Sequence, residues 1–316
     1  MSTETIDTRI AELEVIKSMQ TDEKVLAKDI KIASDGAVAS IKGKEFEVSK
    51  VGIMSLIKAL KMPASYFRRY PVEGEFTEHA NTLLKASDNR EILVRTQGAQ
   101  VRAFLPNTYG IFDDIDVLRA IKAHEVKFPN YDMHMLRHED AVSTCMIRFG
   151  NALTVADEIY PMFRFSNSET GFNNLIIEMG LFRLVCTNGM VRKQSEFGYM
   201  KWAHTLKNFT KVSQFIDFSM SRGLDKVGQM QLKFEEARTE LIKIPVPRII
   251  GDLLDRKRVS RKFATEMLKA NEATPFTTKF ELINHITQKA QDERSWASRT
   301  RYEALGAQIL DAELVA

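Results

Sequence analysis

The sequence predicts an α+β protein with a mainly antiparallel central sheet, a small N-terminal β meander with a helical insert, and a helical C-terminal third. Short runs of β-branched and aromatic residues dominate the middle of the chain. Beyond Asn208, apolar residues recur at helical spacing in long segments. We therefore expect three regions: residues 1–90, residues 91–207, and residues 208–316, with the last packed on the central sheet.

Residues 25–48 alternate apolar and polar side chains around two tight-turn sequences, Ser34-Asp35-Gly36 and Lys42-Gly43-Lys44. This pattern predicts short antiparallel strands. Ser49 is a candidate N-cap for a helix that ends before Pro63. The first region therefore begins with a β meander followed by a helix.

Two further helical segments, residues 64–70 and 76–85, complete the insert. Arg68 and Arg69 end the first of them and could imitate a DNA-reading helix-turn-helix element. Paired short helices are more often packing units, so we interpret this insert as structural.

The middle region carries strand patterns broken by one helix, from about Asp113 to His124. Asp113, Asp114 and Asp116 stand where this helix begins and are interpreted as capping residues. The C-terminal region predicts five helical segments, interrupted by three prolines: residues 212–244, 248–255, 260–270, 279–290 and 295–314.

A chain of 316 residues with 44% hydrophobic and 28% charged residues can form a large core without metal or disulfides. No run reaches the roughly 18 uncharged residues of a membrane span, and the N-terminus does not resemble a targeting segment. We expect a cytoplasmic protein without membrane association, in the host cytoplasm if phage-encoded. Cys145 and Cys186 lie in apolar runs and are interpreted as reduced core thiols.

Five strand-like segments each place an arginine between apolar neighbours. If the neighbours face the core, the guanidinium groups face the other way and gather on one sheet surface that suits phosphate. The alternative is that they pair with acidic residues such as Glu91, Asp157, Glu169 and Glu178, or lie under the C-terminal helices. We favour binding of nucleic acid by these arginines: Arg95, Arg102, Arg148, Arg164 and Arg183.

Positive charge is concentrated in one stretch, although the whole chain carries a formal charge of only +3. Residues 192–262 contain 16 Lys or Arg and 8 Asp or Glu. Such a stretch is either a solvated helical surface or a binding surface. Cations interleaved with aromatic rings suit a single strand, so we add these candidates: Arg192, Lys193, Lys201, Trp202, Lys207, Arg256, Lys257 and Arg258.

The motifs of common enzymes are missing from the sequence, including phosphate-binding loops, dinucleotide fingerprints and nucleophile elbows. His134 and His138 are four residues apart beside Glu139, but their surroundings alternate like a strand and no third ligand has a diagnostic spacing. We therefore predict no metal, no cofactor and no catalytic residues.

Several short motifs of the sequence resemble those of the phage and plasmid proteins grouped as domain of unknown function 932. The resemblance spans most of the chain, from about Lys50 to the segment near Ile309. The resemblance implies a protein encoded on a mobile element, often near genes for replication and recombination. It implies no established activity. The words that carry it are Leu93-Val94-Arg95, Val101-Arg102-Ala103-Phe104, Tyr109, Asp113-Asp114, Phe165 to Gly171, Cys186 to Met190, and His204-Thr205.

The leading hypothesis is a phage or plasmid protein that binds or anneals single-stranded DNA as an accessory to replication or recombination. The first alternative is a non-catalytic, oligomeric assembly protein whose C-terminal helices pack between subunits. The second is an unrecognised nucleic-acid enzyme with His134, His138 or His204 as a general base.

Overall fold

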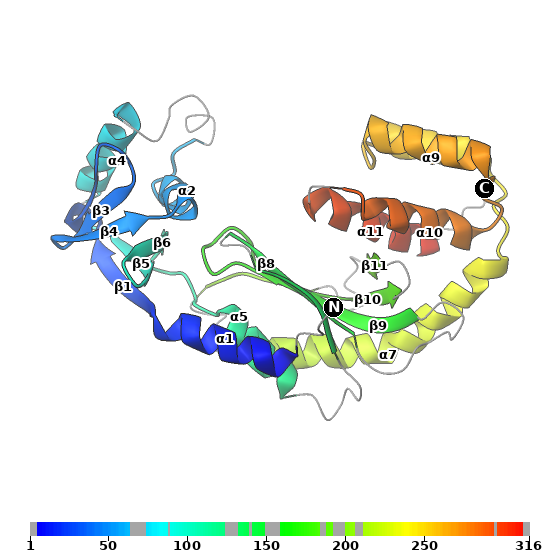
Figure 1. Cartoon of the computed structure of the whole chain (residues 1–316), viewed down its shortest axis with the longest axis horizontal. Helices are drawn as coiled ribbons and strands as arrows, with labels where there is room; N and C mark the ends of the chain where they lie inside the picture. Colours follow the sequence, from blue (N-terminus) through cyan, green and yellow to red (C-terminus); the bar gives the residue numbers. More distant parts are fainter. Residues whose placement is uncertain are drawn as a thin grey trace.

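The computed structural model describes residues 5–63, 74–87, 89–123, 132–138, 141–148, 159–183, 188–191, 200–205, 211–293 and 296–311. It confirms the predicted α+β class, with two sheets followed by a group of helices. Figure 1 shows a crescent, with the first sheet at one end, the C-terminal helices at the other, and the second sheet between them.

The first sheet has the strand order β1-β5-β6-β4-β3-β2. All its neighbouring strands pair antiparallel except β4 and β6, which are parallel. Its strands are β1 (Gln20–Leu26), β2 (Ile30–Ile32), β3 (Val38–Ile41), β4 (Lys44–Val48), β5 (Glu91–Gln97) and β6 (Gln100–Pro106).

Strands β5 and β6, which we expected in the central sheet, instead lie inside the first sheet. Strand β1 pairs with the whole of β5, from Gln20 opposite Gln97 to Leu26 opposite Glu91. Only Val25 of β1 is buried, so the hydrophobic alternation that identifies a strand is almost absent there. Strand β1, through which residues 91–106 pair with the N-terminal region, therefore has almost no hydrophobic pattern by which the sequence could predict it.

Helices α2 (Lys50–Ala59) and α4 (Glu75–Ala86) cover one face of the first sheet. Ser49 caps α2 as predicted, since its hydroxyl accepts a hydrogen bond from the Gly52 amide at 2.9 Å. A Cβ on Gly52 would lie 2.8 Å from the carbonyl oxygen of Val101, so glycine permits close approach of α2 to β6. Arg68 and Arg69 lie outside the described residues.

The second sheet is antiparallel, in the order β11-β10-β9-β8-β7, with β12 also paired to β10. Cys145 is buried in β8, as predicted, whereas Cys186 lies outside the described residues. The strands are β7 (Asp132–His138), β8 (Ser143–Arg148), β9 (Ile159–Asn167), β10 (Leu175–Arg183), β11 (Asn188–Val191) and β12 (Met200–Trp202).

One face of this sheet packs against α1 (Ile6–Ser18), α5 (Asp114–Lys122) and the start of α7 (Val212–Thr239). Asp113 and Asp116 form a capping box at the start of α5, which confirms their predicted capping role. In Figure 1, α7 runs from beneath the sheet to the C-terminal helices.

The C-terminal helices enclose their own apolar core, which confirms the predicted helical third. Helix α7 ends at Thr239 rather than at Ile244; Glu240 is extended, and Leu241 forms an isolated β-bridge with Thr278. Over the described ranges, no helix has the length and apolar character needed to cross a bilayer. The remaining helices are α8 (Val246–Asp255), α9 (Arg261–Ala273), α10 (Lys279–Ala290) and α11 (Trp296–Asp311).

Candidate nucleic-acid interface

Arg95 of β5 is enclosed by carboxylates at the junction between the two sheets. Its side chain is buried, with Nε 2.6 Å from Oδ1 of Asp22 and Nη2 2.8 Å from Oδ1 of Asp113. Nη1 donates to the carbonyl oxygen of Glu169 at 2.8 Å. Burial disfavours the charge, but Asp113 and Asp22 outweigh it and raise the pKa of Arg95 above its ordinary value. Arg95 therefore stays charged and paired inside the protein.

Arg102 of β6 pairs with the side chain of Glu169 from the loop after β9. Nη1 of Arg102 lies 2.9 Å from Oε2 of Glu169, and both side chains are buried. Burial, with the nearby carboxylates Asp114 and Asp113, raises the pKa of Glu169 despite Arg102. For Asp113 the balance is reversed: burial pushes its pKa up, but Arg95 and Lys17 lower it overall. The junction thus holds carboxylates with opposite shifts.

Arg164 of β9 is buried on the face of the second sheet that meets α11. Its Nε donates to Oε2 of Glu178 on β10 at 2.7 Å, and its Nη1 donates to Oε2 of Glu303 on α11 at 2.7 Å. Glu303 is fully buried and also accepts from Nε of Arg299 at 3.2 Å. Arg164 therefore joins two strands to a C-terminal helix.

The expectation of an open, arginine-bearing sheet surface is wrong for Arg95, Arg102 and Arg164, which are only 3%, 6% and 2% exposed. The side chains alternate along the strands as predicted, but packed elements cover the face opposite the apolar core. The alternative prediction of ion pairs is confirmed, with Glu169 and Glu178 as partners.

The other two strand arginines, Arg148 and Arg183, do not provide an open arginine-bearing surface among the side chains that the structure describes. Arg148 is half-buried, with its guanidinium carbon 4.8 Å from the centre of the Tyr160 ring. Arg183 ends β10 opposite Ile159, and its side chain lies outside the described residues. The guanidinium groups described here are therefore distributed over two sheets.

Several of the motifs that carry the family resemblance lie close together at the junction between the two sheets. The Tyr109 hydroxyl donates to the carbonyl oxygen of Ser168 at 2.7 Å, and the Asp114 amide donates to Oε1 of Glu169 at 3.0 Å. Asn167 donates from Nδ2 to Oδ1 of Asp114 at 2.9 Å. Residues from motifs that are far apart in the sequence therefore form one buried polar network between the two sheets.

His204 closes this network from the segment after β12. Its ring stacks on Tyr109 and on Phe112, with centroid distances of 4.9 Å and 4.0 Å. Nδ1 lies 3.2 Å from the carbonyl oxygen of Gly110, and Nε2 lies 2.9 Å from Oδ1 of Asn167. Burial lowers the pKa of His204 to about 4, although the bond to Gly110 opposes this. At neutral pH the ring is uncharged and donates to only one of these two oxygens.

The predicted basic and aromatic segment after Arg192 is described only in part. Lys201 is exposed on β12. Trp202 is half-buried, and its ring packs 4.6 Å from that of Phe215 on α7, at the edge of the core. The side chains of Arg192, Lys193 and Lys207 lie outside the described residues. Among these candidates, Lys201 is the exposed cation that the structure describes.

A different group of cations is exposed where α8 turns into α9, and we call it the basic corner. It includes the predicted residues Arg256, Lys257 and Arg258, all exposed. Between residues 248 and 262, six cationic side chains accompany two carboxylates, Asp252 and Asp255. Arg248 lies near the start of α8, and the five cations of the basic corner lie where α8 turns into α9: Arg256, Lys257, Arg258, Arg261 and Lys262.

The turn that carries the basic corner is fixed to the helical core. Val259 is buried, and the Ser260 amide donates to the Tyr302 hydroxyl at 3.2 Å. Ser260 also caps α9, accepting from the Phe263 amide at 3.1 Å. No acidic residue occupies the first turn of α9. The positive end of the α9 dipole therefore adds to the charge of the side chains.

The sequence interpretation did not single out Arg248, which is exposed in the first turn of α8, at the other end of that helix from Arg256. It also missed Lys17 and Asp22, whose partners at the junction are distant in sequence.

A metal site is not evident in the described part of the chain, where no three His, Cys, Asp or Glu side chains gather as a ligand set. His134 and His138 lie on a strand, β7, as their alternation predicts, and their side chains are outside the described residues.

Comparison with known proteins identifies one family. Its model, described as Domain of unknown function (DUF932), matches residues 105–309. The match covers the junction loop, the second sheet and the C-terminal helices up to α11, and leaves out most of the first sheet. Neither the curated proteins nor the solved structures give a match.

Proposed function

The chain belongs to the DUF932 family, and we propose that it binds nucleic acid, preferentially single-stranded DNA, through the basic corner. The observation that carries the proposal is the exposure of Arg256, Lys257 and Arg258 on a turn that is anchored to the core. Such a group is the arrangement that attracts phosphates, because neutralising them releases counterions.

Arg256, Lys257 and Arg258 differ from the buried strand arginines in having no ion-pair partner among the described residues, whereas Lys262 lies 3.9 Å from Glu266. Arg258 donates to the neutral amide oxygen of Gln308 at 2.7 Å, and among the described residues no ion pair engages Arg256 or Lys257. These cations are exposed, so they can meet phosphate oxygens without first breaking a buried salt bridge.

Single-stranded DNA is favoured over duplex because the charge lies on a short turn and two helix ends. Duplex DNA is stiff over roughly 150 base pairs, so it offers a small corner only the few phosphates that lie along its straight surface. A single strand can bend around it while its phosphates meet the side chains. The same proposal includes a role in replication or recombination, an origin in a phage or plasmid, and a cytoplasmic location. It also includes that the protein binds DNA without catalysing a reaction.

Fluorescence anisotropy with a labelled oligothymidine measures this binding directly. The expected result is saturable binding at 50 mM salt that weakens steeply as salt rises, since the logarithm of the affinity falls by about 0.7 per phosphate contact per logarithm of salt concentration. A labelled duplex of equal length is expected to bind less tightly. Flat traces at micromolar protein and low salt would contradict the proposal.

Assembly between copies of the chain is a second candidate function, supported by exposed apolar residues on α7. Phe218 and Leu232 are 50% and 66% exposed and stand 14 residues apart, so they lie on nearly the same face of the helix. Light scattering with and without oligonucleotide separates the candidates. A stable oligomer indifferent to DNA would favour assembly.

A further inference from the structure

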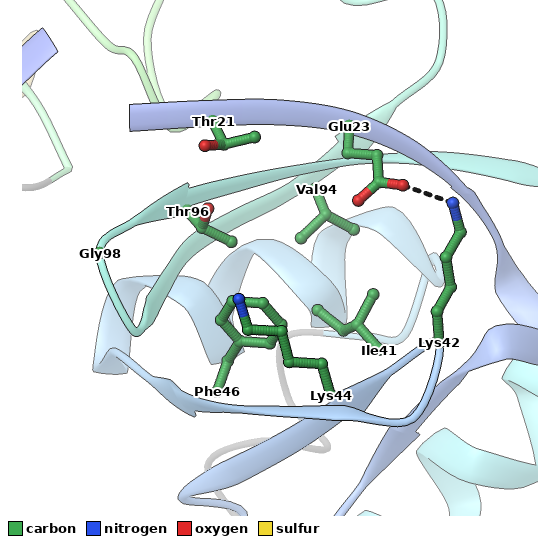
Figure 2. Close-up of a pocket in the computed structure, with 9 residues that line it drawn as sticks. All are labelled: Thr21, Glu23, Ile41, Lys42, Lys44, Phe46, Val94, Thr96 and Gly98. Carbon is green, nitrogen blue, oxygen red and sulfur yellow. Dashed lines mark hydrogen bonds and ion pairs between the residues drawn. The ribbon is translucent and has the colours of Figure 1, made fainter. Parts of the chain in front are cut away.

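The first sheet contains a pocket of about 260 Å³ at the open end of its apolar core. Figure 2 shows β1 along one side, with Thr21 and Glu23, and β4 along the other, with Lys44 and Phe46. Val94 and Thr96 of β5 lie between them. The pocket exists because β4 pairs with β6 only at Glu47 and Val48, so its first residues stay paired with β3 but separate from β6.

The floor of this pocket is apolar and its rim is polar. Ile41 and Val94 are buried, and Phe46 is half-buried with its ring toward the pocket. The rim carries the hydroxyls of Thr21 and Thr96. Apolar walls with a few polar groups at the edge are typical of ligand sites.

Charge at the rim favours an anion. Lys42 and Lys44 contribute two ammonium groups, and Glu23 contributes one carboxylate. Glu23 is already paired with Lys42, as the dashed line in Figure 2 shows. Lys44 makes no ion pair among the described residues, and its Nζ lies 5.0 Å from the centre of the Phe46 ring. The ammonium lies over the ring face that points into the pocket, so a base that stacks on Phe46 displaces the Lys44 side chain toward the rim.

From this geometry we infer that the pocket receives one nucleotide of a single strand, with the base against Phe46 and a neighbouring phosphate at Lys44. Base stacking on an aromatic side chain and a cation for the backbone are the two contacts that single-strand binding uses. The volume is below the roughly 300–1,000 Å³ of pockets that enclose a drug-sized molecule. It therefore fits one base with its sugar and phosphate outside.

This inference deepens the proposed function and rests on it, but it uses a separate surface. In Figure 1 the first sheet and the C-terminal helices stand at opposite ends of the crescent. The pocket lies before residue 105, outside the segment that the family model matches. A nucleotide site here would be a property of this chain rather than of the matched domain.

Photo-crosslinking locates the base. An oligothymidine containing 5-iododeoxyuridine is bound to the full chain, irradiated, and the tryptic peptides are analysed by mass spectrometry. We expect an adduct on residues 45–50, the fragment between Lys44 and Lys50, whose only aromatic residue is Phe46. The adduct should disappear in Phe46→Leu, which keeps an apolar side chain in the floor.

Anisotropy with the same oligonucleotide measures the contribution of the pocket. Phe46→Leu should weaken binding at least about five-fold, the lower end of what one stacked base contributes. Lys44→Gln should also weaken it, whereas Lys24→Gln is a matched control because Lys24 is exposed on the opposite face of β1. Thermal melts verify that each variant folds.

The outcomes separate this inference from the proposed function. If the wild-type chain binds but residues 45–50 carry no adduct, or if Lys44→Gln binds as tightly as Lys24→Gln, the pocket inference is overturned and the proposed function stands. If the wild-type chain does not bind the oligonucleotide at all, both fail.

Discussion

Arg164 and Arg256 carry the same guanidinium group in opposite surroundings. Arg164 is 2% exposed and held between Glu178 and Glu303, whereas Arg256 is exposed at the end of α8. The first contributes to folding and is sequestered from any polyanion in this conformation, and the second is available to one. An arginine flanked by apolar residues in a strand therefore indicates a buried ion pair as readily as a binding surface.

The largest expected effect comes from removing the buried cation. Arg164→Met should lower the free energy of unfolding by about 3–5 kcal/mol, because Glu178 would lose its cation and the buried Glu303 would keep only Arg299. Urea denaturation measures this. The matched control, Arg256→Met, should change it by less than about 0.5 kcal/mol. Equal effects of the two substitutions would erase the distinction between the regions.

The buried region should also respond to acid through His204. Its pKa is about 4 in the folded protein against an ordinary value of 6.5, so between these values the unfolded chain binds a proton that the folded protein does not. Stability due to His204 is complete above pH 6.5 and is lost as the pH falls toward 4, by about 3 kcal/mol in total. Unfolding curves of the wild type and His204→Gln, compared across this window, isolate the contribution. Parallel curves would show that the ring titrates normally.

Neutralising the basic corner should change binding while preserving stability. Arg256→Gln, Lys257→Gln and Arg258→Gln together should leave the urea midpoint nearly unchanged, since all three side chains are exposed. The slope of log affinity against log salt should decrease by about 2, from three lost phosphate contacts. A salt titration of oligonucleotide binding measures this slope. An unchanged slope would mean that the phosphates contact other residues.

The smallest effect, and the sharpest contrast with Arg164, is expected from Lys257→Gly. Lys257 has a backbone φ of 54°, which glycine adopts without steric cost. The substitution should raise the unfolding free energy by up to about 1 kcal/mol while removing one cation from the corner. Thermal unfolding together with anisotropy should show a more stable protein that binds less tightly. A loss of stability would contradict the conformation of this turn.

The sequence predicted the α+β class, the cap of α2, the capping box of α5 and most of the C-terminal helices, because these depend on local patterns. Pairing between distant segments was less accessible. Strand β1 is mostly exposed and polar, so neither its existence nor its pairing with β5 has a hydrophobic signature.

The candidate site divides in the same way. Exposure of Arg256, Lys257 and Arg258 follows from a charged turn between two helices, which local sequence indicates. The fate of Arg164 depends on Glu303, which is 139 residues away in the chain. Alternation places the guanidinium on the correct face of β9 but does not reveal that α11 covers that face.

The most direct test of the account compares two sets of three substitutions with equal loss of charge. One set neutralises Arg256, Lys257 and Arg258 to glutamine, and the other neutralises Lys50, Lys61 and Lys85, which are exposed around α2 and α4. Anisotropy with a labelled oligothymidine at 50 mM salt should show a clear loss of affinity in the first set and near wild-type binding in the second. An equal loss of affinity in both sets would mean that binding depends on overall charge alone. No loss of affinity in the first set would mean that the basic corner does not bind the oligonucleotide.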